Sequence, residues 1–236
     1  MLEPKDYIII LLGILPSVLA NILSYLFKYS YILHVLYLSI IAFLIYVLVI
    51  FCNKLLLVRK IGIKRIELNI SNGTNTEQIL DKVQHQFVMM GRSGSRFIEA
   101  KNFESCISRC DIRTPIRFLF LQPRSKACEL LSKERNVSSN HASDILIASL
   151  RSLKKFKDNG YNIKVGFYDN PNYKPNLRVV IIDNNEAYIS HYLRGQTGKE
   201  SIQLVLEKNI SGANNLFQAF SNFFESSWDI ARKIEL

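Results

Sequence analysis

The apolar positions of this chain are concentrated near its N-terminus, in two runs that contain no Asp, Glu, Lys or Arg. The runs are residues 7–27, YIIILLGILPSVLANILSYLF, and residues 32–52, ILHVLYLSIIAFLIYVLVIFC. At about 1.5 Å of rise per residue, a helix over either run is roughly 30 Å long, which matches the hydrocarbon core of a bilayer. We therefore predict a transmembrane helical hairpin over residues 1–52.

A signal peptide and a buried hairpin of a globular domain are the alternatives to this hairpin. A signal peptide has a basic segment before its apolar core and a small-residue cleavage site after it. Here Glu3, Lys5 and Asp6 nearly cancel in charge before the first run, and the second run follows after only KYSY. Both features favour the membrane hairpin.

The segment after the second run, residues 53–65, is basic and contains no acid. Its positive charges are Lys54, Arg59, Lys60, Lys64 and Arg65. Basic flanks of membrane spans stay in the cytoplasm. We therefore predict two membrane spans with both termini cytoplasmic, and a juxtamembrane linker whose five cations contact anionic lipid. The net charge of +10 agrees with lipid or nucleic acid as a partner.

From residue 66 onward the pattern changes to short apolar runs and helical repeats. Apolar spacing predicts a helix over residues 76–90, stopped by Gly91, and the pair Asn184-Asn185 predicts a hairpin turn. The other expected elements are strands at 65–70, 115–123, 162–168, 177–183, 186–192 and 200–208, and helices near 103–107, 124–134, 142–158 and 213–233. This order predicts one cytosolic α/β domain over residues 66–236, with a mixed sheet covered by helices.

The cysteines do not form a metal-binding pattern. Cys106 and Cys110 are four residues apart on an expected helix, but Cys52 and Cys128 add no ligand spacing and no histidine completes a zinc set. We predict reduced, free thiols, no metal site and no cofactor.

One stretch carries a family resemblance: NLRVVIIDNNEAYISHYL, residues 176–193. It resembles the strand, turn and strand of the phospholipase D superfamily, whose signature is H-x-K, four residues, D, and about six residues later G-S-x-N. Asn176, Arg178 and Asp183 fall on the His, Lys and Asp positions, and Ser190 and His191 on the Gly and Ser positions. The resemblance covers about residues 95–236 and implies a phospholipase D-like domain in which these five residues form a degenerate phosphate-binding motif.

The resemblance also implies a loss of catalysis. In the family the histidine attacks phosphorus and the lysine neutralises the phosphate oxygens. An asparagine amide is no comparable nucleophile, whereas Arg178 keeps the charge and can grip a phosphate. We expect a non-catalytic domain in which Arg178 pairs with the carboxylate of Asp183 or with a bound anion. The alternative is a membrane-tethered phosphodiesterase or nuclease of this superfamily, which acts through His191 or through a dimer; otherwise His191 is a half-buried, hydrogen-bonded side chain.

The first apolar run has a face of small and polar residues: Gly13, Ser17, Asn21 and Ser24. Such a face favours close helix packing, either within one hairpin or between hairpins of a homo-oligomer. A two-span anchor with a cytosolic sensor domain resembles the membrane effectors of bacterial anti-phage defence systems, of the retron or cyclic-nucleotide type. A plain membrane scaffold is a third alternative.

The resemblance to defence effectors implies a function and a set of partners. The sensor domain would control membrane permeabilisation by the oligomerising hairpin, and thereby growth arrest or cell death. The implied partners are inner-membrane lipid, further copies of the chain, a phosphate-bearing ligand, and a cytosolic regulator such as a reverse transcriptase with its RNA/DNA hybrid.

Overall fold

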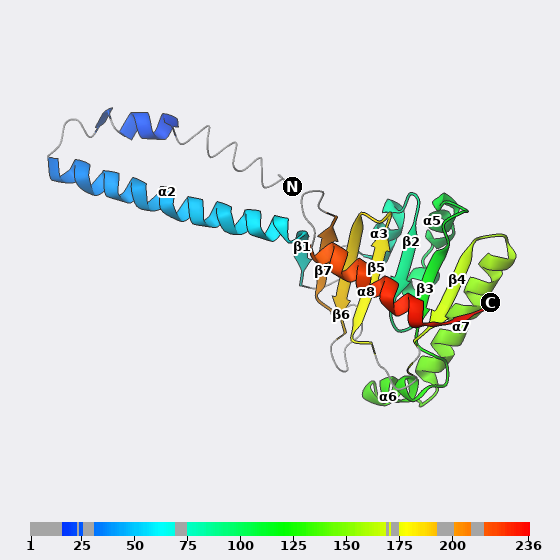
Figure 1. Ribbon diagram of the computed structural model, residues 1–236. Helices are drawn as coiled ribbons and strands as arrows, with labels where there is room; N and C mark the ends of the chain where they lie inside the picture. Colours follow the sequence, from blue (N-terminus) through cyan, green and yellow to red (C-terminus); the bar gives the residue numbers. More distant parts are fainter. Residues whose placement is uncertain are drawn as a thin grey trace. The chain divides into compact units, whose positions relative to one another are not determined.

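The computed structural model describes residues 16–22, 24–25, 31–68, 75–168, 170, 175–192, 201–208 and 215–236. The chain forms two compact units, Met1–Leu56 and Leu57–Leu236. All strands of the described chain belong to the second unit (Figure 1).

Helix α2, Tyr31–Lys60, is the long helix of the first unit, and its last residues belong to the second. Its segment Val35–Leu56 has a mean hydropathy of 2.9, and no part of this segment is buried. Within the described residues it is the one helix that is long and apolar enough to cross a membrane. Residues 16–22 and 24–25 of the first expected span are helical as well, but the rest of 7–27 lies outside the described residues. The two-span hairpin therefore stays a prediction.

Eight strands form one mixed sheet in the order β1-β7-β6-β5-β2-β3-β4-β8 (Figure 1). Strands β2, β3 and β4 are parallel neighbours, and the remaining neighbours are antiparallel. The bounds are β1 Ile63–Glu67, β2 Phe87–Met90, β3 Ile116–Phe120, β4 Ile163–Phe167, β5 Leu177–Ile182, β6 Glu186–His191, β7 Gln203–Glu207 and β8 Arg232–Ile234. The expectation of a mixed α/β sheet is confirmed.

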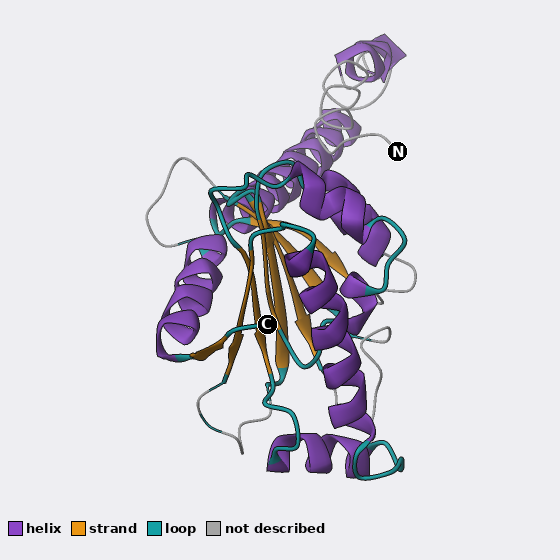
Figure 2. Ribbon diagram, turned by 90° about the vertical axis from the view of Figure 1, so that its right-hand side faces the viewer, coloured by secondary structure: helices purple, strands orange, loops and turns teal. Residues whose placement is uncertain are grey.

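Helices cover both faces of this sheet (Figure 2). On one face, α8, Leu216–Ile230, contacts β5, β6 and β7. On the other face, aromatic rings join helices to strands, as where Phe97 lies 5.8 Å from Phe87 of β2 and Phe103 lies 6.2 Å from Phe118 of β3. Within the described part of the second unit, the other helices are α3 Thr76–Lys82, α4 Ser95–Ile98, α5 Phe103–Arg109, α6 Lys126–Glu134 and α7 His141–Asp158.

The helix expected over residues 76–90 is wrong in its second half. α3 ends at Lys82, and the next residue, Val83, is extended, with its N–H bonded to the carbonyl of Leu80. Residues 87–90 form β2, which lies between β5 and β3 and is buried at all four positions. A central strand buried on both faces reads as a continuous apolar run, so its period is hidden and FVMM could be taken as the end of a helical stripe.

The hairpin between β5 and β6 turns one residue earlier than expected. Asp183 and Asn184 are the residues with positive φ, at 52° and 49°. Asn185 donates its N–H to the carbonyl of Ile182, at 3.0 Å. Two successive left-handed residues are typical of a type I′ turn, which Asp and Asn tolerate better than most residues.

Candidate anion-binding site

A cavity of about 250 Å³ lies where the end of β2 meets the start of β5 and the residue after β6. Four arginines line it, and the described lining residues include no Asp or Glu: Arg92, Arg96, Arg135 and Arg178. Gly94 allows the loop after β2 to close this wall, because its φ is 67° and an added Cβ would lie 2.6 Å from Cζ of Phe120. The cavity is therefore electropositive, because its charged lining residues are all arginines.

Arg178 is the most deeply placed of these arginines, with 4% of its surface exposed. Its Nη2 donates to Ser190 Oγ at 2.9 Å and to Gln203 Oε1 at 3.1 Å. Its guanidinium carbon lies 5.5 Å from the ring centre of Phe97, and its Nε is buried without a hydrogen-bond partner. Burial lowers the pKa of Arg178 from its ordinary value. A buried guanidinium whose direct hydrogen-bond partners, Ser190 and Gln203, are neutral favours the entry of an anion, since burying a charge without an adjacent counter-charge is costly.

Arg92 forms the second half of the positive wall. It is 9% exposed, its guanidinium carbon lies 4.1 Å from the ring centre of Tyr192, and its Nε donates to the carbonyl of Pro175 at 3.4 Å. Burial lowers its pKa, and the charge of Arg135 acts in the same direction. The guanidinium is held in place by stacking and by a backbone carbonyl, both of which leave its charge available to a ligand.

Asn176, on the position of the family's nucleophile, is exposed at the start of β5. Its carbonyl accepts the N–H of Tyr192 at 2.6 Å. Ser190 is fully buried and bonded to Arg178. His191 pairs with Leu177, one residue from the Arg178–Ser190 pair, so its exposed side chain points to the opposite face of the sheet. The structure thus joins Arg178 to Ser190 and places His191 away from both.

Asp183 does not pair with Arg178, and that expected contact is wrong. The two residues lie at opposite ends of β5. The Asp183 carboxylate accepts the backbone N–H groups of Gln84, His85 and Gln86, at 3.0, 2.7 and 2.8 Å. The carboxylate therefore fixes the segment that enters β2. The other part of the expectation, a bound anion at Arg178, stays a prediction.

The residues expected to form a basic linker, 53–65, are divided between two elements. Lys54 and Lys60 lie in α2, as does the backbone of Arg59, whose side chain is outside the described part of the chain. Lys64 and Arg65 lie in β1. Lys64 Nζ is 3.1 Å from Glu186 and 3.6 Å from Glu207, and Arg65 Nε is 2.7 Å from Glu67. Two of the five cations thus have carboxylate partners within the domain.

The expected assembly face of the first apolar run is described in part. Gly13 lies outside the described residues, whereas Ser17, Asn21 and Ser24 are helical and exposed. Ser24 Oγ donates to the carbonyl of Asn21 at 2.8 Å. This hydroxyl therefore has a partner within its own helix.

Sequence reasoning missed most of the cavity. Arg92, Arg96 and Arg135 are not among the residues that the sequence pattern predicts for the site. The signal in the sequence is a pair of arginines that flank Ser93-Gly94-Ser95 directly after β2. The four cysteines are free, and no cluster of His, Cys, Asp and Glu suited to a metal occurs among the described residues.

No known family model matches this chain, and no curated protein matches it. Solved structures show distant likenesses. They include the archaeal chromatin protein TrmBL2, at 14% identity and TM-score 0.43 over 72% of this chain and 54% of that one. The phospholipase D family member Nuc from Salmonella typhimurium has 11% identity and TM-score 0.40 over 68% and 89% of the chains.

A third likeness is to phosphatidylserine synthase of Haemophilus influenzae Rd KW20, at 10% identity and TM-score 0.46 over 72% of this chain and 38% of the synthase. The matched region thus spans about half of TrmBL2 and less of the synthase. At these scores the likenesses assign neither a family nor an activity to the chain.

Proposed function

We propose that the second unit is a non-catalytic, membrane-anchored domain that binds a phosphate-bearing ligand in the four-arginine cavity. The main support for this proposal is the environment of Arg178. Its guanidinium is buried, and its hydrogen-bond partners Ser190 and Gln203 are neutral. Three further arginines line the same cavity: Arg92, Arg96 and Arg135. Arginine is suited to phosphate because its planar fork donates two parallel hydrogen bonds.

The absence of a nucleophile at the expected position supports binding without turnover. Asn176 shares the strand face of Arg178, two residues away, but its amide cannot attack phosphorus as a histidine does. His191 points to the opposite sheet face, so it is not placed to replace the nucleophile. A phosphodiesterase or nuclease of the phospholipase D superfamily is the alternative, favoured only by the resemblance of β5 and β6 to that motif.

A titration with inorganic phosphate and pyrophosphate tests the binding proposal. The full chain in detergent micelles is compared with Arg178→Met, Arg178→Lys and the control Arg151→Met, an exposed position on α7. Loss of a charge-assisted contact worth about 1.5–3 kcal/mol weakens binding roughly 10- to 100-fold in Arg178→Met. Arg178→Lys gives an intermediate loss and Arg151→Met gives none. Equal affinity of Arg178→Met and the wild type would remove the cavity as the binding site.

We further propose that the protein acts as a membrane effector of a retron-like anti-phage defence system. Ligand or partner binding to the domain would release an oligomerising two-helix hairpin, which permeabilises the inner membrane and causes growth arrest or cell death. The unburied apolar segment Val35–Leu56 and the exposed Ser17, Asn21 and Ser24 support this assignment. The proposed partners are anionic lipid, further copies of the chain, and a cytosolic regulator such as a reverse transcriptase with its RNA/DNA hybrid.

Membrane depolarisation in cells that express the full chain tests this output. We expect depolarisation by the wild type and at least a several-fold smaller effect with Asn21→Leu, which removes the intramembrane polar contact. Ile45→Leu, on the exposed surface of α2, serves as the matched control. Growth arrest without depolarisation would exclude permeabilisation and favour damage by the cytosolic domain.

A further inference from the structure

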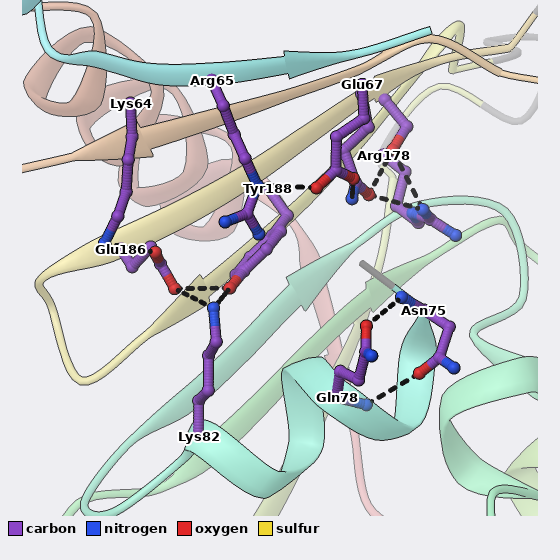
Figure 3. A network of polar contacts seen from close by, with 11 residues as sticks. Lys64, Arg65, Glu67, Asn75, Gln78, Lys82, Arg178, Glu186 and Tyr188 are labelled. Carbon is purple, nitrogen blue, oxygen red and sulfur yellow. Dashed lines mark hydrogen bonds and ion pairs between the residues drawn. The ribbon is translucent and has the colours of Figure 1, made fainter. Parts of the chain in front are cut away.

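A chain of polar side chains links four adjacent strands, β5, β6, β7 and β1, from the arginine cavity to the edge of the sheet (Figure 3). It begins at Arg178 on β5, passes through Gln203 on β7 and ends at Glu67 on β1. Strand β1 is the first element after α2, so this route connects the cavity to the strand that continues the apolar helix.

Gln203 is the central link and is fully buried. Its Oε1 accepts from Arg178 Nη2 and from Ser190 Oγ, both at 3.1 Å, and its Nε2 donates to Glu67 Oε2 at 2.8 Å. The carbonyl end of the amide thus faces a cation, and the amine end faces a carboxylate. This orientation aligns the amide dipole between the two charges, and in a low-dielectric interior such aligned bonds strengthen one another.

Glu67 is the carboxylate through which this route compensates the buried charge of Arg178. Glu67 also accepts a hydrogen bond from Arg65 Nε, at 2.7 Å. Glu67 lies on an edge strand whose one ladder is with β7, in the register Glu67↔Gln203. The second half of β1 is therefore attached to the sheet by this ladder and by the attraction between Glu67 and the Gln203–Arg178 pair.

The first half of β1 has its own attachments. Lys64 pairs with Glu186 and Glu207, and a register shift between Ile63 and Arg65 separates the two halves. The two residues that join α2 to β1 are also tied down: Leu216 donates to the carbonyl of Ile61, and Glu207 to that of Gly62, both at 2.9 Å. A change at Glu67 therefore acts on a segment only five residues beyond this junction.

We propose that Gln203 is a positioning residue that couples occupancy of the arginine cavity to the mobility of residues 65–67 of β1. This inference rests on the proposed function of the cavity. An anion bound to Arg178 supplies the counter-charge that Glu67 provides in its absence. The polarisation of the Gln203 amide then falls, the attraction for Glu67 weakens, and residues 65–67 of the edge strand open more often.

Hydrogen exchange of the full chain in detergent micelles tests the coupling, with inorganic pyrophosphate as the probe and binding measured calorimetrically in the same samples. In the wild type, pyrophosphate raises exchange in β1 at least threefold and leaves the interior strand β4, between β3 and β8, unchanged. In Gln203→Leu and in the milder Glu67→Gln, pyrophosphate still binds, but β1 exchange no longer responds to it. Binding to the wild type without a change in β1 overturns the coupling and leaves the proposed binding function intact.

A second experiment tests the coupling without ligand. It is decisive even if pyrophosphate does not bind, and that failure to bind would count against the proposed function. Arg178→Met removes the charge that polarises Gln203 and raises β1 exchange at least threefold. The matched variant Arg92→Met removes a charge from the same cavity without touching Gln203, and leaves β1 exchange unchanged. Equal effects of the two variants, or no effect of Arg178→Met, overturn the coupling whatever the ligand.

Discussion

Replacement of Asp183 tests whether this residue belongs to the fold or to the ligand site. Its carboxylate accepts three backbone N–H groups, from Gln84, His85 and Gln86, and it lies in a left-handed turn conformation with φ 52°. Asparagine is the best substitution for isolating the charge, because it has nearly the same shape and also tolerates this φ.

The magnitude of the Asp183→Asn effect follows from these bonds. The amide oxygen can keep the N–H groups of His85 and Gln86, which bond Oδ1, but at neutral rather than charged strength. The N–H of Gln84 lies 3.2 Å from Oδ1 and 3.0 Å from Oδ2, and its nearer acceptor becomes an NH₂ group. A charged hydrogen bond contributes about 1.5–3 kcal/mol and a neutral one about 0.5–1.5 kcal/mol. Because Gln84 and His85 are exposed, we expect a loss near the low end, about 2 kcal/mol of unfolding free energy. Asp183→Ala loses all three bonds and adds turn strain, so about 4 kcal/mol is expected.

Urea unfolding of the full chain in detergent measures this loss through the fluorescence of Trp228. It is the single tryptophan of the chain, is 8% exposed and stacks on Phe224 at 6.1 Å. Phosphate affinity of the folded variants is measured beside it. Affinity should stay within twofold of the wild type, because Asp183 and Arg178 are about 16 Å apart along β5.

Two results would refute this reasoning about Asp183. A loss below about 0.5 kcal/mol in Asp183→Asn would mean that its three backbone bonds do not hold the start of β2. A tenfold loss of phosphate affinity at unchanged stability would return Asp183 to the ligand site.

Three further predictions concern the carboxylate cluster, the loop of the cavity and turnover. Burial raises the pKa of Glu186, but hydrogen bonds from Tyr188 and Lys64 and the charge of Lys82 outweigh it, so the pKa lies below its ordinary value. Its contribution to stability is therefore present above about pH 4.5 and lost as pH falls through the lower folded value, and Glu186→Gln should flatten acid unfolding curves there. Gly94→Ala, which meets Phe120, should cost about 2–4 kcal/mol by thermal unfolding, whereas Gly160→Ala, with φ 95° and open space, should cost only about 1–2 kcal/mol; equal losses would show that the clash is relieved. The purified chain should hydrolyse neither phospholipid nor nucleic acid, and turnover that disappears in His191→Ala would establish the enzyme alternative.

Much of the fold was readable from the sequence because it depends on local pattern. The strands β3 to β7 and the helices α6, α7 and α8 were all expected near their observed bounds, and the apolar run 32–52 lies within α2, which continues to Lys60. Each shows its period, its caps or its flanking turn residues within a short window, and burial of one face suffices to select the element. Residues 87–90 failed because a central strand has no exposed face from which its period can be read.

The sequence by itself determined that an apolar helix adjoins an α/β domain, and it singled out Arg178 through a resemblance to the lysine position of the phospholipase D motif. Only the tertiary structure decided what surrounds this arginine. Gln203 of β7 bonds it, and Arg92 from the loop after β2 and Arg135 at the end of α6 line the same cavity. Asp183 instead bonds the backbone that enters β2. The physical reason is that the energy of a buried charge depends on the groups within a few ångströms of it. Those groups come from segments that are far apart in the sequence, so their distances from one another cannot be read from the sequence.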